Sequence, residues 1–125
     1  MSKLAGIPLN ELERRYEQHD MIPQAILNAP ISRVARALRS EVVRGHDDLD
    51  EYEGTAAVLQ DDSILEPIPI ALKHYAGYPP NTTTIYLPNW INDLDKITDV
   101  VSLIVQALHL TLRDVAWQRA DNPDL

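Results

Sequence analysis

The sequence contains no cysteine and no phenylalanine, and it has only four glycines among 125 residues. Without cysteine there is no disulfide, no thiolate metal site and no cysteine nucleophile. The glycines are isolated, so a glycine-rich phosphate-binding loop is not expected. Since two tryptophans and five tyrosines supply all the aromatic rings, leucine, isoleucine and valine must fill most of the core.

Long apolar runs are also missing. The first residues, Met1 to Gly6, lack the apolar stretch of a secretory signal. No window reaches the roughly 18 uninterrupted apolar residues that a membrane-spanning helix needs. We therefore expect a cytoplasmic protein that does not cross a membrane, and no motif indicates a cofactor.

The length of the chain fits a single domain over residues 1–125, with residues 1–6 and 120–125 expected to be flexible. The net charge of −8 is unevenly distributed. Residues 1–45 hold seven Lys or Arg against five Asp or Glu, whereas residues 46–125 hold four against fourteen. Such asymmetry indicates a nucleic-acid surface, or two surfaces that meet within one molecule or between copies. The acidic total argues against nonspecific nucleic-acid binding.

Periodicity and breaker residues predict an α+β fold. Apolar residues at helical spacing predict helices over 9–18 and 30–45. Alternating or β-branched runs predict strands over 55–59, 64–72 and 82–87, and the acidic segment 46–54 is expected to be an exposed loop. We therefore expect N-terminal helices and a small antiparallel sheet of two or three strands. A long C-terminal helix over residues 93–119 is expected to pack across this sheet.

The predicted last helix has more than one apolar face. Leu103, Leu110 and Trp117 recur every seven residues, apart from its main core face. A surface helix needs only one apolar face, and an exposed second line lowers solubility. These three residues therefore indicate an interface, most simply that of a homodimer; the alternative is burial beneath the N-terminal helices.

Polar residues of the same predicted helix suggest a pocket. Gln106 and His109 lie on its narrow polar stripe, and Tyr86 lies on the clearest predicted strand. If the stripe lines a cavity between sheet and helix, these three side chains are the polar contacts for a small ligand. A stripe that simply faces solvent is the alternative.

The segment from Leu27 to Arg39 resembles the turn and recognition helix of a helix-turn-helix motif, in which Leu and a turn residue precede a Val-x-Arg-Ala-Leu-Arg helix. The resemblance covers about a tenth of the chain. It implies a DNA-binding regulator with its motif at residues 23–39 and with Arg33, Arg36 and Arg39 available to the nucleic acid. An amphipathic helix with solvent-facing arginines is the alternative.

No motif identifies a catalytic residue or a set of metal ligands. The histidines do not have metal-ligand spacing, and no serine lies in a nucleophile elbow. The sequence therefore favours a non-enzymatic interaction protein that forms homo-oligomers through an apolar helix face. A DNA-binding regulator and a small-ligand or enzymatic pocket are the alternatives.

Overall fold

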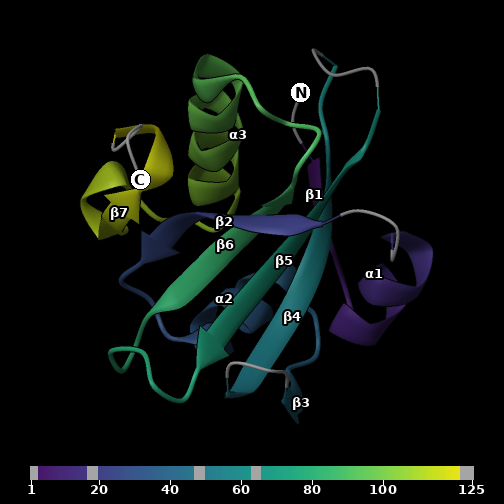
Figure 1. Cartoon of the computed structure of the whole chain (residues 1–125), viewed down its shortest axis with the longest axis vertical. Helices are drawn as coiled ribbons and strands as arrows, with labels where there is room; N and C mark the ends of the chain where they lie inside the picture. The colour runs from purple at the N-terminus through teal and green to yellow at the C-terminus, as the bar shows by residue number, and fades with distance from the viewer. Residues whose placement is uncertain (1–2, 17–19, 47–49, 63–65, 122–125) are drawn as a thin grey trace.

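The computed structural model describes residues 3–16, 20–46, 50–62 and 66–121, and Figure 1 shows how its elements are arranged. In chain order they are β1 (Lys3–Ile7), α1 (Leu9–Tyr16), β2 (Met21–Leu27), α2 (Ile31–Leu38), β3 (Val43–His46), β4 (Glu51–Gln60), β5 (Ile68–Tyr75), β6 (Thr83–Pro88), α3 (Leu94–Ala107) and β7 (Val115–Gln118). Two short 3-10 turns, η1 (Leu112–Asp114) and η2 (Arg119–Asp121), flank β7.

Within the described residues, seven strands form one antiparallel sheet in the order β1-β4-β5-β6-β2-β7, and β3 pairs with β4 beside β1. The prediction of a small sheet with two or three strands was therefore wrong. β5 and β6 lie where apolar and β-branched residues predicted strands. β2 was missed because the break at residues 19–20 and Pro23, which suits the first turn of a helix, predicted a second short helical piece there. Pro23 instead lies next to a bulge in the pairing of β2 with β6, where a missing N–H is tolerated.

The remaining unpredicted strands are short and lie at the borders of the sheet. β1 covers residues that were expected to be flexible, and it pairs with β4 from Lys3–Gln60 to Ile7–Ala56. β3 and the start of β4 cover most of the acidic segment that was expected to be an exposed loop. Strands of four or five residues are held by their neighbours, so their own sequence carries little signal.

One face of the sheet, which we call the inner face, packs against α2 and α3 and forms the main core. Its strand residues alternate with residues of the opposite face, and they include Ala25, Leu27, Ala57, Leu59, Ile68, Ile70, Leu72, Ile85 and Leu87. α3 contacts both β1 and β2, which lie far apart in the strand order. The sheet therefore curls around the helices, and α2 lies behind the strands in Figure 1.

The opposite face, which we call the outer face, carries α1 over its β4–β5 part. Leu9 and Leu12 of α1 pack on Ala56 and Ala71, and all four side chains are buried. This close approach depends on Gly54, because a Cβ at that position would come within 2.7 Å of Cδ2 of Leu9. α1 begins at Leu9, as the sequence predicted.

α3 ends at Ala107, so the prediction of one helix over residues 93–119 was wrong. His109 adopts a left-handed conformation with φ of 60°. The backbone N–H of His109 donates to the carbonyl of Gln106, and that of Leu110 donates to the carbonyl of Val105. This pair of bonds is a Schellman motif, which turns the chain so that Leu110 enters the core. The apolar residues after Ala107 keep a helical spacing only by coincidence, because they belong to a turn and to strand β7.

α2 also ends earlier than predicted, at Leu38 instead of near Gly45. Arg39 has φ of 53°, and the N–H of Ser40 donates to the carbonyl of Ala35. Beyond this turn, the Ser40 hydroxyl donates to the carbonyl of Ile7 at 2.8 Å and accepts from the Thr55 hydroxyl at 2.7 Å. These bonds link α2 to β1 and β4. In the described ranges, no helix is long and apolar enough to cross a membrane.

Candidate functional site

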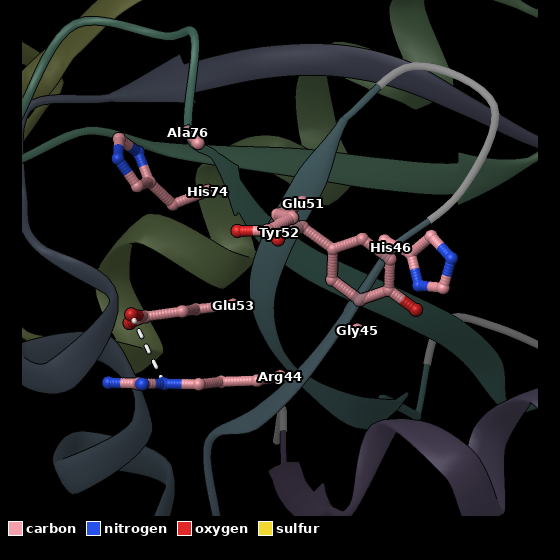
Figure 2. Close-up of a pocket in the computed structure, with 8 residues that line it drawn as sticks. All are labelled: Arg44, Gly45, His46, Glu51, Tyr52, Glu53, His74 and Ala76. Carbon is pink, nitrogen blue, oxygen red and sulfur yellow. Dashed lines mark ion pairs between the residues drawn. The ribbon is translucent and has the colours of Figure 1, made fainter.

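The structure contains a hollow of about 540 Å³ at the end of the sheet where β3, β4 and β5 lie side by side. The strand register places its polar residues in two cross-strand rows. The first row is Arg44, Glu53 and His74. In the second row, His46 pairs with Glu51, whose backbone carbonyl accepts from the N–H of Ala76 at 2.9 Å. Figure 2 shows the side chains of Arg44, Glu53 and His74 pointing to one side of the strands, with Tyr52 pointing to the other.

The charged pair in the hollow is long and exposed. Nε of Arg44 lies 3.6 Å from Oε1 of Glu53, and the two side chains are 85% and 41% exposed. An ion pair this exposed contributes little to stability. Nδ1 of His74 is buried and has no hydrogen-bond partner among the described residues. The hollow therefore offers charged groups of both signs, although the Arg44–Glu53 pair does not hold them in a fixed geometry.

The described lining of the hollow combines an arginine, two glutamates, two histidines and a tyrosine. Its residues include no serine, threonine, cysteine or lysine that a neighbouring base could activate as a nucleophile. The imidazoles of His46 and His74 lie well apart in Figure 2. In the part of the chain that the structure describes, no group of three or more His, Cys, Asp or Glu side chains could hold a metal ion.

The predicted ligand pocket of Tyr86, Gln106 and His109 is not formed. Tyr86 lies on β6 and packs against the α1 cluster of the outer face. Gln106 and His109 are exposed at the end of α3, which packs on the inner face. The three residues therefore lie on different sides of the sheet, because the hypothesis depended on a helix continuing through His109.

The helical line of Leu103, Leu110 and Trp117 is not formed either. Leu103 is on α3 and partly buried against the main core, and Leu110 is 8% exposed within that core. Trp117 is on β7, where it pairs with Ile26 of β2 and is half-buried. The proposed interface thus loses Leu110, whereas Trp117 remains on the protein surface.

The arginines of the helix-turn-helix resemblance all lie at the surface. Arg33 and Arg36 are exposed on α2, and Arg39 is exposed just after it. However, residues 21–27 form strand β2, so a supporting helix does not precede the arginine helix. The three arginines are displayed together without the helix-turn-helix arrangement that the resemblance implied.

The strand register reveals a further surface that the sequence did not indicate. Successive cross-strand pairs join Lys73 of β5 to Thr84 of β6, Thr84 to Ile26 of β2, and Ile26 to Trp117 of β7. In the adjacent row, Tyr86 of β6 pairs with Pro23 of β2. These six residues lie on the outer face and form what we call the outer patch: Pro23, Ile26, Lys73, Thr84, Tyr86 and Trp117.

Along the row from Ala56 through Ala71 and Tyr86 to Pro23, exposure increases with distance from α1. Ala56 and Ala71, beneath α1, are 0% and 3% exposed, whereas Pro23, in the same row on β2, is exposed. Ile26, Tyr86 and Trp117 are partly exposed. The outer patch is therefore an apolar and aromatic sheet surface that α1 covers incompletely.

Two polar groups distinguish the outer patch from an ordinary apolar surface. Lys73 is half-buried, with Nζ 4.6 Å from the ring centroid of Tyr52 and 5.7 Å from that of Tyr86. Aromatic faces attract a cation in this geometry. Thr84 is 1% exposed, and its hydroxyl has no hydrogen-bond partner among the described residues. Only the register of four strands brings the six patch residues together, so no local sequence signal could have found the patch.

No known protein-family model matches the chain, and no curated protein or solved structure is significantly similar to it.

Proposed function

We propose that this protein is a non-enzymatic interaction protein that forms a homodimer through its outer patch. The observation that carries the proposal is the continuous cross-strand row from Lys73 through Thr84 and Ile26 to Trp117. Aromatic side chains beside apolar ones on an otherwise charged surface are typical of interfaces.

The composition of the patch favours a second copy of the chain as the partner. Lys73 lies at one end of the row and Trp117 at the other, and none of the six residues is acidic. A two-fold axis between Thr84 and Ile26 would place Lys73 of one copy opposite Trp117 of the other. Such an interface is isologous, and each of its two cation–π contacts would contribute about 0.5–2 kcal/mol.

The arrangement also keeps like charges apart. Neighbouring strands are about 4.8 Å apart, so the two Lys73 ammonium groups would lie on opposite sides of the axis, well separated. The strongly acidic residues 46–125 contribute only Lys73, Thr84, Tyr86 and Trp117 to the patch. Because each copy has a net charge of −8, the two copies repel each other at low ionic strength. Added salt screens this repulsion and should strengthen the association.

Sedimentation equilibrium over a range of protein concentrations tests this proposal. The wild-type chain should reach twice the monomer mass, and Trp117→Arg should remain a monomer because it puts a positive charge opposite Lys73 of the other copy. Trp90→Arg is the matched control, since Trp90 is 38% exposed on the connection before α3, outside the patch. A monomeric wild type, or equal dissociation by both substitutions, would show that the outer patch is not a dimer interface.

A further inference from the structure

α2 presents three arginine side chains to solvent with no partner. Arg33, Arg36 and Arg39 are all exposed, and none of their side chains makes a hydrogen bond or ion pair within the described structure. Arg15 and Arg44, in contrast, each pair with a glutamate. Arg14, Arg113 and Arg119 are also unpaired among the described residues, so α2 differs from the rest of the chain in gathering three unpaired arginines on one surface.

The charge around α2 is positive over a long stretch of sequence. Residues 21–40 contain Arg33, Arg36 and Arg39 as their only charged residues, so this stretch has no internal carboxylate to neutralise them. Arg33 and Arg36 are three residues apart on a helix, which places their Cβ atoms about 5–6 Å apart on one side. The solvent face of α2 is therefore a small cationic surface on an acidic protein.

This surface is also rigidly held. Ile31, Val34, Ala35 and Leu38 are buried and fix α2 on the inner face. Arg39 occupies the left-handed position that ends the helix, with φ of 53°, where glycine is the usual residue. An arginine at this position carries a conformational cost that a glycine would avoid, and strained residues of this kind cluster at functional sites.

The guanidinium groups of α2 and the net charge of the chain together indicate which class of partner this surface binds. A guanidinium group binds carboxylates and phosphates in a bidentate geometry. Domains that bind nucleic acids are usually basic, whereas this chain has a net charge of −8 and would repel a long polyanion. A short acidic segment carries few charges, and a Debye length of about 8 Å screens it from carboxylates elsewhere on the protein.

We infer that the solvent face of α2 binds a carboxylate-rich segment of a partner protein through Arg33, Arg36 and Arg39. The surface is independent of the outer patch, because α2 packs on the inner face of the sheet and the outer patch lies on the opposite face. A dimer formed through the outer patch would leave both copies of α2 accessible.

Fluorescence anisotropy with a labelled glutamate-rich peptide tests the inference. The wild-type chain should bind the peptide at about 0.15 M salt, where the Debye length is about 8 Å, and the affinity should fall as more salt is added. The double substitution Arg33→Glu with Arg36→Glu should weaken binding at least about tenfold, which corresponds to about 1.4 kcal/mol. Arg33→Lys with Arg36→Lys should retain part of the affinity, because the charge remains and the planar fork is lost.

The control changes the net charge equally at other exposed positions, with Arg14→Glu and Arg113→Glu. It should leave peptide binding within about twofold of the wild type, since it removes no contact and its effect is only long-range. Circular dichroism checks that each variant is folded, and Arg33→Gln with Arg36→Gln replaces the glutamate pair if that pair unfolds the chain. Equal weakening by the control, no binding by the wild type, or tighter binding of a DNA duplex than of the peptide would overturn the inference.

Discussion

Ile26 on β2 lies directly opposite Trp117 on β7, on the outer face of the sheet. The pair joins the N-terminal quarter of the chain to its last strand and completes the row that begins at Lys73. Neither side chain belongs to the main core, although the neighbouring residues Leu27 and Val115 pack into it or against it. The sheet thus separates a dry inner face from a partly exposed outer face, and the proposed dimer depends on that separation.

The adjacent threonines of β6 should respond in opposite ways to the same substitution. The Thr83 hydroxyl donates to the carbonyl of Ala29 at 2.8 Å, whereas the buried Thr84 hydroxyl has no partner in the described structure. Thr83→Val should cost about 1–2 kcal/mol, because it leaves a buried carbonyl unpaired. Thr84→Val should be neutral or stabilising, because it removes an unpaired polar group and keeps the shape. Urea unfolding of both variants measures the difference; an equal loss in both would show that Thr84 does have a partner.

His109 should be replaceable by glycine with a gain in stability. It holds φ of 60° at the end of α3, a conformation that glycine adopts without steric cost. His109→Gly should raise the free energy of unfolding by about 0.5–1 kcal/mol. Gln106→Gly, one turn earlier within the helix, should lower it by about 1 kcal/mol. Thermal unfolding of the two variants tests the position of the helix end, and destabilisation by both would indicate that the helix continues through His109.

The inner face should account for most of the stability. Leu72 of β5 is fully buried in the main core, whereas Leu112 in η1 is 64% exposed. Leu72→Ala should cost about 2–5 kcal/mol through lost burial and the cavity that remains. Leu112→Ala should change stability by less than about 0.5 kcal/mol. Chemical denaturation measures both values, and a small effect at Leu72 would contradict the placement of β5 at the centre of the sheet.

The sequence predicted those parts of the fold whose local pattern and tertiary setting agree. α1, β5 and β6 have such patterns, as does the buried stripe of α2 from Ile31 to Leu38. The end of α3 could not be predicted from periodicity, because the chain turns at His109 and not at a glycine or proline. The apolar residues that follow His109 continue the helical spacing, although they lie in a turn and in β7. Arg33 and Arg36 lie on a helix as predicted, whereas Arg39 follows its end, and strand β2 before the helix rules out the helix-turn-helix interpretation.

The binding surfaces depend on long-range pairing and so leave almost no trace in the sequence. Lys73, Thr84, Ile26 and Trp117 come from four strands, and their proximity follows from the register alone. The sequence predicted Trp117 as an interface residue because a helix over 93–119 would place it apart from the main core face. It remains on the surface for a different reason: β7 places it on the face of the sheet that α1 covers incompletely.

The most direct measurement of the proposed dimer uses the absence of cysteine from the chain. Ile26→Cys introduces a single thiol beside the expected two-fold axis, and a short bis-maleimide can span the roughly 10 Å between packed sheets. Leu112→Cys provides an exposed thiol outside the outer patch as the control. Mass spectrometry should find a covalent dimer of the Ile26→Cys chain at concentrations where the Leu112→Cys chain remains a monomer. Equal cross-linking of the two variants, or none of either, would contradict a homodimer through the outer patch.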